Sequence, residues 1–361
     1  MVDSQLNMKQ SMPTKKSILI LLAGLLIFLF YLYFFVGFED IIEVIGNSNP
    51  INFYFYFSFA IVMTLLGVLS YSLTWRELLG CLSIKTSYWK VVSYCFVSNF
   101  VDLIIPLEAV SGEIVKTYLV ANDMGAELEG DIGKIISSVI SHRVISTFTI
   151  LIGLVIGSFS IVFVPNLSMQ VFLLLIIVLP ITLFFFILLF LLSTNKRIAV
   201  RIVNLFLRCA EFLTRGRLNI SDLKAKVHSV LLNFHQGIQV FRHNPRTLTK
   251  PLLFSFLAWF TNLITYLLVF YSLGVTWIPL NMLIIVYVVA ITVQTLPVGL
   301  PVGLVEIVMS SLYIMFGVDR AISGTVTTLT RVATFWVQLL IGYVIIQWFG
   351  IKNFTFQKNK I

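Results

Sequence analysis

Charged residues are scarce in this chain of 361 residues. Asp, Glu, Lys and Arg make up 11% of it, whereas 58% of the residues are hydrophobic and the mean hydropathy is +0.98. A soluble globular protein carries about 25% charged residues, so that class is excluded. The apolar runs are about 20 residues long and do not alternate with polar residues, which excludes a barrel. The composition therefore predicts an all-α polytopic membrane protein, because lipid accepts only helices or closed barrels.

Cysteine and catalytic motifs are also sparse. The three cysteines, Cys81, Cys95 and Cys209, are far apart and form no CxxC pair, so neither a disulfide framework nor a zinc site is predicted. The four histidines lack the spacing of metal ligands. There is no nucleophile elbow, Walker loop, HExxH or paired-aspartate signature. We therefore predict a protein that is not an enzyme and needs no metal or cofactor.

Positive charge is concentrated in one segment. The net charge is +9, and eleven of the 25 Lys and Arg lie between residues 193 and 250, together with only two acidic residues. A basic segment between membrane spans is typical of a cytoplasmic loop, and this one is also suited to bind acidic lipid head groups. No recognition motif accompanies the charge, so nucleic-acid binding is not expected.

The hydrophobic runs divide the chain into parts. A basic end followed by an apolar run resembles a signal peptide, but no cleavage site follows, so we interpret the run as a retained first span. The predicted parts are a cytoplasmic N-terminus at 1–17, a first span at 18–36, a first repeat at 53–164, a linking span at 171–192, the basic cytoplasmic segment at 193–250, a second repeat at 252–349 and a cytoplasmic tail at 350–361. This predicts a multi-pass protein of the plasma membrane with both termini in the cytoplasm.

Residues 53–164 and 252–349 share one order of parts. Each half has a full span, a short apolar arm, a break, a short helix that carries Glu and a long helix that carries Arg. The breaks contain Pro106 and Gly112 in the first half, and Pro297, Gly299, Pro301 and Gly303 in the second. One span separates the halves, which predicts an inverted-topology repeat. The short arms favour two re-entrant hairpins added to six full spans, whereas the competing topology lets each arm pair cross twice.

Ionisable residues stand inside the apolar segments. A charge at mid-membrane costs roughly 3 kcal/mol, so it marks a functional site by default. Glu113 and Lys116 share one helix face, and the last span carries a polar stripe with spacings of four, three and four residues, made of Thr327, Arg331, Thr334 and Gln338. The candidate site residues are Glu113, Lys116, Arg143, Glu306, Arg331, Asn99, Thr334 and Gln338, with Asp102, Gln294 and Thr295 as weaker candidates.

Two interpretations of these residues stay open. In the first, each Glu pairs with an Arg, Glu113 with Arg143 and Glu306 with Arg331, and merely holds a hairpin in place. In the second, they also line a polar path for a charged head group, because an Arg guanidinium binds phosphate with two hydrogen bonds. His142 is expected to be a hydrogen-bonded interhelical residue rather than a proton relay.

These residues carry a resemblance to a known family. Asn99, Pro106, Gly112-Glu113, Lys116 and the later Arg143 resemble the first signature of the flippase-like family, the lysylphosphatidylglycerol synthase transmembrane region (UPF0104). The turn containing Pro297, Gly299 and Gly303, followed by Glu306 and Arg331, is similar to the second signature. The first turn departs from the common Arg-x-Gly-Glu form, because Val110-Ser111 precede Gly112.

The resemblance implies a membrane protein that handles lipids. In multiple-peptide-resistance proteins this region moves aminoacylated phosphatidylglycerol between leaflets, and a synthase domain follows it. We expect a stand-alone membrane domain here. The resemblance favours translocation of a phospholipid or polyprenyl-linked head group, with anionic or phosphate-bearing lipids as partners. The alternatives are an ion-coupled transporter of a small solute, and a non-catalytic partner of a lipid-modifying enzyme or glycosyltransferase.

Overall fold

The computed structural model describes residues 38–104, 111–124, 129–161, 194–213, 220–295 and 301–358, together with scattered residues between 173 and 192. Helices account for nearly all of these residues, and no strand occurs among them, which confirms the all-α prediction. The predicted first span at 18–36 lies outside the described residues, as do most of the linking span at 171–192 and the break residues Pro106, Pro297 and Gly299.

Four helical stretches in the described ranges are long and apolar enough to cross a membrane. They are Pro50–Cys81, Asp131–Gly157, Pro245–Ser272 and Arg320–Trp348. They belong to α3 (Pro50–Cys81), α6 (Glu129–Ile161), α10 (Thr249–Ser272) and the pair α13 (Arg320–Arg331) and α14 (Val337–Lys358). A π-helical turn, η3 (Val332–Trp336), joins α13 to α14. The predicted last span is thus interrupted just after Arg331.

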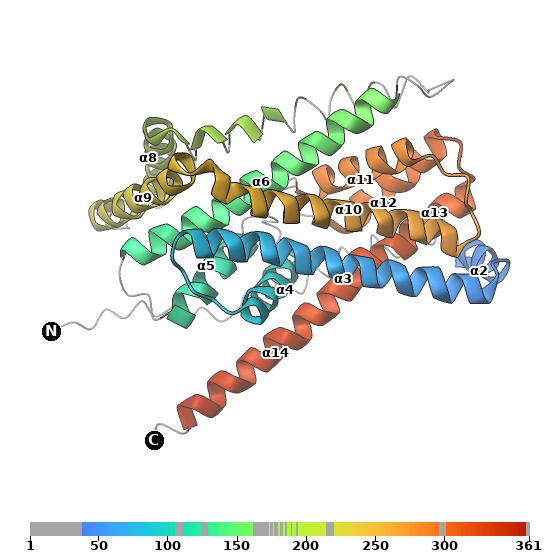
Figure 1. Cartoon of the computed structure of the whole chain (residues 1–361), viewed down its shortest axis with the longest axis horizontal. Helices are drawn as coiled ribbons and strands as arrows, with labels where there is room; N and C mark the ends of the chain where they lie inside the picture. The colour runs from blue at the N-terminus through green and yellow to red at the C-terminus, as the bar shows by residue number, and fades with distance from the viewer. Residues whose placement is uncertain are drawn as a thin grey trace.

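Four shorter helices form two antiparallel pairs. The first pair is α4 (Tyr88–Ile104) with α5 (Ser111–Met124), and the second is α11 (Leu280–Thr295) with α12 (Pro301–Met315). They contain 14 to 17 residues, so at 1.5 Å per residue they span about 21 to 25 Å, less than the roughly 30 Å of a hydrocarbon core. The two pairs lie toward opposite ends of the molecule (Figure 1).

The packing of the helices is symmetric between the two halves. Helix α3 packs along α10, and the two run in opposite directions (Figure 1). Helix α4 packs against α14 of the second half, and α11 packs against α6 of the first half. Two preceding helices fit the same scheme, because α2 (Phe38–Gly46) contacts α13 and α9 (Ile220–His243) contacts α6. Each half therefore completes the surroundings of the other.

Small residues let α3 and α10 approach closely. Thr64 and Thr265 share a hydrogen bond at 3.2 Å between their hydroxyls, and the Thr265 hydroxyl also lies 3.3 Å from the carbonyl of Ala60. A Cβ added to Gly67 would lie 2.7 Å from the amide nitrogen of Asn262. Small and hydroxyl-bearing residues are the usual means by which membrane helices pack. This contact fixes the distance between the halves, and thus the width of the space between them.

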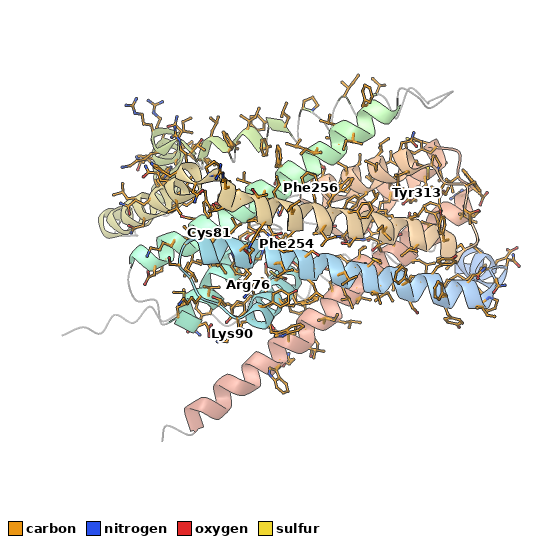
Figure 2. The ribbon with its side chains drawn as sticks, viewed as in Figure 1. Arg76, Cys81, Lys90, Phe254, Phe256 and Tyr313 are labelled. Carbon is orange, nitrogen blue, oxygen red and sulfur yellow. The ribbon has the colours of Figure 1, made fainter. Side chains whose placement is uncertain are left out.

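The basic segment lies at one end of the bundle. Its helices α8 (Lys196–Leu213) and α9 contact each other, and the Ser137 hydroxyl on α6 donates to the carbonyl of Phe234 on α9 at 2.7 Å. Arg76 and Lys90 lie in the same half of the view, whereas Tyr313 lies toward the opposite end (Figure 2). Arg76 and Lys90 therefore lie toward the end of the molecule that holds α8 and α9.

Candidate functional site

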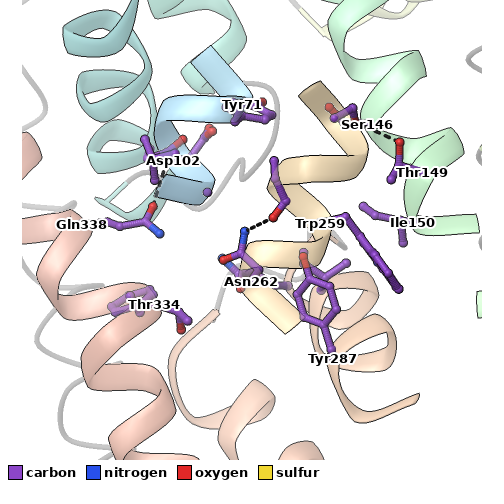
Figure 3. Close-up of a pocket in the computed structure, with 18 of the residues that line it drawn as sticks. Tyr71, Asp102, Ser146, Thr149, Ile150, Trp259, Asn262, Tyr287, Thr334 and Gln338 are labelled. Carbon is purple, nitrogen blue, oxygen red and sulfur yellow. Dashed lines mark hydrogen bonds between the residues drawn. The ribbon is translucent and has the colours of Figure 1, made fainter. Parts of the chain in front are cut away.

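A cavity of about 260 Å³ lies between the two halves. Helices α3 to α6 supply one part of its wall, and α10, α11, α13, η3 and α14 supply the other. Figure 3 shows Tyr71 and Asp102 from the first half, opposite Asn262, Thr334 and Gln338 from the second. This volume is slightly below the usual range of small-molecule pockets, about 300 to 1,000 Å³, and suits a polar group of modest size.

Six of the eight candidate residues line this cavity. They are Asn99, Glu113, Arg143, Arg331, Thr334 and Gln338. The other two, Lys116 and Glu306, are 1% exposed and stand behind the lining residues as their ion-pair partners. The structure thus brings together residues that are up to 239 positions apart, since the Asn99 amide donates to the Gln338 side-chain oxygen at 3.0 Å.

In the second half, the predicted ion pair forms. The Nε of Arg331 donates to Glu306 Oε1 at 2.7 Å, and its Nη1 donates to the Gln294 oxygen at 3.3 Å. The other Glu306 oxygen accepts from the Gly303 backbone N–H at 2.6 Å. Gly303 has a φ of +93°, which favours glycine. Arg331 also stacks on Phe335, with its central carbon 4.3 Å from the ring centroid. The guanidinium is therefore already neutralised and held.

In the first half, the expected pairing of Glu113 with Arg143 is wrong. Glu113 pairs instead with Lys116 on its own helix, at 3.5 Å between Nζ and Oε2. Lys116 also donates to the Tyr71 hydroxyl at 3.1 Å and lies over the rings of Tyr71 and Trp75. Glu113 pairs with Lys116 rather than Arg143 because side chains three residues apart on one helix are neighbours, whatever the position of another helix.

Arg143 is left without a counter-ion among the described residues. Its side chain lines the cavity and is half-buried, and no ion pair within 4 Å involves it. Two further donors of the cavity wall, the Ser146 hydroxyl and the Trp259 indole N–H, have no hydrogen-bond partner in the part of the chain that the structure describes. One fixed cation beside two unused donors is the arrangement that binds an anion.

Asp102 and the start of α5 form a rigid part of the wall. One carboxylate oxygen of Asp102 accepts from the Ser111 hydroxyl at 2.7 Å and from the Gly112 backbone N–H at 2.6 Å. A side chain at Gly112 would collide with Asp102 and Ser98. Gly112 is thus needed for close approach of the two helices, and its role at the predicted break is packing against α4.

Several lining residues are absent from the set predicted from the sequence. Tyr71 and Gly67 on α3 and Ser255, Trp259 and Asn262 on α10 all line the cavity. A signal existed, because Ser255 and Asn262 are seven residues apart in an apolar span and therefore share one face. Thr327 of the predicted stripe is buried but does not reach the cavity. The described residues contain no group of three or more His, Cys, Asp or Glu placed to hold a metal ion.

Comparisons with known proteins agree on one family. The model of the family described as "Lysylphosphatidylglycerol synthase TM region" matches residues 21–342. A UPF0104 membrane protein of Pyrococcus horikoshii is 24% identical over 340 residues, which cover 92% of this chain and 96% of that protein. A UPF0104 membrane protein of Methanothermobacter thermautotrophicus is 24% identical over 317 residues, which cover 87% of this chain and 90% of that protein.

Proposed function

The chain belongs to the lysylphosphatidylglycerol synthase transmembrane-region family, and we propose that it moves the anionic head group of a lipid between leaflets through the cavity between its two halves. The head group occupies the polar space while its acyl or polyprenyl tails stay in the bilayer. The observation that carries this proposal is Arg143, a cation that faces the cavity and has no ion-pair partner among the described residues.

The chemistry of the wall supports a phosphate-bearing ligand. The Arg143 guanidinium has five N–H donors in a fork that matches two phosphate oxygens. Ser146 and Trp259 add one donor each on the same cavity. The bundle's outer surface is apolar, with Val155, Phe159 and Leu253 among its exposed side chains, so the ligand's tails have a lipid environment available outside the cavity.

The membrane arrangement is part of the same proposal. The pairs α4–α5 and α11–α12 are re-entrant hairpins that enter from opposite faces and add to six full spans. Their short lengths and their places at opposite ends of the bundle support this arrangement. The end that holds α8 and α9 lies on the cytoplasmic side of the plasma membrane, because basic residues are concentrated there.

A leaflet-exchange assay tests the proposal. The protein is reconstituted into vesicles with fluorescent phosphatidylglycerol, and the rate at which label becomes accessible to an external quencher is measured. Arg143→Gln should slow exchange at least about tenfold, since a hydrogen bond to a charged group contributes about 1.5 to 3 kcal/mol. The matched control is Lys134→Gln, which removes an exposed cation from the same helix outside the cavity, and it should exchange at the wild-type rate.

The alternatives predict other outcomes. A transporter of small solutes exchanges no labelled lipid but takes up an anionic solute in an Arg143-dependent manner. A partner of a lipid-modifying enzyme or glycosyltransferase shows neither activity by itself. Exchange that is equal for wild type and Arg143→Gln contradicts the assignment of the anion site.

A further inference from the structure

The charges around the cavity balance when it is empty. Among the described residues, Asp102, Glu113, Arg143 and Arg331 line the cavity, and Lys116 and Glu306 stand directly behind them. Three acidic and three basic side chains make this set neutral. A head group with one negative charge therefore leaves an excess charge in a site shielded from water, which is unfavourable. One proton taken up by a carboxylate of the site restores neutrality.

The three carboxylates differ in their hydrogen bonds. Asp102 accepts from the Ser111 hydroxyl and the Gly112 backbone N–H. Glu306 accepts from Arg331 on one oxygen and from the Gly303 N–H on the other. Glu113 Oε2, by contrast, is buried and has no hydrogen-bond partner among the described residues, although Lys116 stands 3.5 Å away. Its side chain is 18% exposed and borders the cavity. Glu113 is thus the least hydrogen-bonded of the three carboxylates, and it lies where a proton from the cavity can reach it.

Titratable and charged side chains from several helices surround Glu113. Around it and its partner Lys116 lie Tyr71 on α3, Cys95 and Asp102 on α4, and His142 and Arg143 on α6, with Tyr266, Tyr287 and Arg331 across the cavity. His142 is fully buried. Its ring lies 4.1 Å from that of Tyr71. The equivalent region of the second half contains the fully bonded Glu306–Arg331 pair instead.

We propose that Glu113 is the proton-carrying group of the cavity, and that one proton enters this carboxylate when a singly charged anionic head group binds at Arg143. The inference rests on the proposed function for its ligand. Protonation removes the negative charge from the Glu113–Lys116 pair, so that the positive charge of Lys116, behind the wall, adds to that of Arg143 in attracting the anion. When the anion leaves, Glu113 releases its proton to the cavity, and the ion pair between Glu113 and Lys116 forms again. Glu306 stays ionised throughout.

Infrared difference spectroscopy tests this step without measuring transport. The protein is placed in nanodiscs of phosphatidylcholine, with or without phosphatidylglycerol, and the band of the protonated carboxyl group is followed as the pH is lowered. In wild type the band should appear, with a midpoint about one pH unit higher in phosphatidylglycerol, because a nearby anion favours the neutral carboxyl. The carboxyl band is separate from the imidazole bands, so His142 does not obscure it.

Two variants and one control assign the band. Glu113→Gln should abolish it, and Asp123→Asn, the control, which removes a carboxylate from the same helix outside the cavity, should retain it. Lys116→Met removes the neighbouring cation and should raise the midpoint, which gives a second reading if Glu113→Gln does not fold. The inference is overturned if the band survives in Glu113→Gln, if Lys116→Met leaves the midpoint unchanged, or if the two lipids give equal midpoints. Leaflet exchange in wild type with equal midpoints would leave the proposed function standing and remove only the proton.

Discussion

Substitutions of Glu306 and Arg331, which form a buried ion pair, should have strongly coupled effects on the free energy of unfolding. Glu306 is 1% exposed and Arg331 is 3% exposed, and their contact is 2.7 Å long. Removal of one member of such a pair costs about 3 to 5 kcal/mol, because a buried charge is left uncompensated. We consider Glu306→Gln, Arg331→Met and the double variant.

The two single variants should not be equal. Arg331 cannot lose its proton, so Glu306→Gln leaves a fixed cation beside the Gln294 oxygen and the Phe335 ring without the carboxylate that balances its charge. This variant should lie near the upper end of that range. In Arg331→Met the remaining Glu306 can take up a proton and become neutral, so its cost should be lower. The double variant removes both charges and should be at least about 2 kcal/mol more stable than the sum of the single effects predicts.

Equilibrium unfolding in mixed micelles, followed by tryptophan fluorescence, gives these free energies. The control is Lys90→Met, which breaks an ion pair with Asp123 whose side chains are 52% and 28% exposed. That change should cost below about 1 kcal/mol. Additivity of the Glu306 and Arg331 variants within about 0.5 kcal/mol would refute the view that the pair is a structural lock.

Three further changes have defined outcomes in the same unfolding experiment. Arg143→Gln should change the free energy of unfolding by less than about 1 kcal/mol, because no ion pair within the described residues is lost. Gly112→Ala should destabilise by more than about 2 kcal/mol, since the new Cβ meets Asp102, whereas Gly80→Ala, with nothing within 4 Å, should not. Gly342→Ala should separate α14 from α4, because its Cβ would lie 2.6 Å from a backbone carbonyl oxygen, and cysteine cross-linking between these helices should then fall.

The order of helices in each half could be predicted from the sequence, because the lengths of the apolar runs determine it. Long apolar runs indicate spans, and shorter apolar runs correspond to α4 and α11, which have 17 and 16 residues, so these helices could be predicted from length. The polar stripe of the last span was visible for a similar reason, since helical spacing places Arg331, Thr334 and Gln338 on one face. These three residues do line the cavity.

The partner of each charge could not be predicted in the same way. Spacing says which residues share a face, but it does not say which side chain of another helix comes within 4 Å. Arg143 and Arg331 occupy corresponding places in the two halves, yet only Arg331 meets its Glu. The wall formed by Asn262 and Trp259 was missed because the packing of α3 on α10 decides that this face of α10 looks into the cavity.

The difference between the halves matters more for mechanism than their likeness. If each half had a Glu–Arg ion pair, both arginines would be neutralised and no cation would remain for a ligand. In the second half, Arg331 is held by Glu306 and Gln294, and Glu306 is held in turn by the Gly303 N–H. In the first half, Lys116 pairs with Glu113 on the same helix, so Arg143 keeps its charge unpaired among the described residues. A buried lysine beside Tyr71 is therefore the feature that leaves the Arg143 guanidinium open to the proposed anion. It follows that Lys116→Met should impair anion binding although Lys116 does not line the cavity, because the negative charge of Glu113 would then no longer be offset by Lys116 and would repel the anion. Binding of labelled phosphatidylglycerol measures this, and unchanged affinity would contradict the argument.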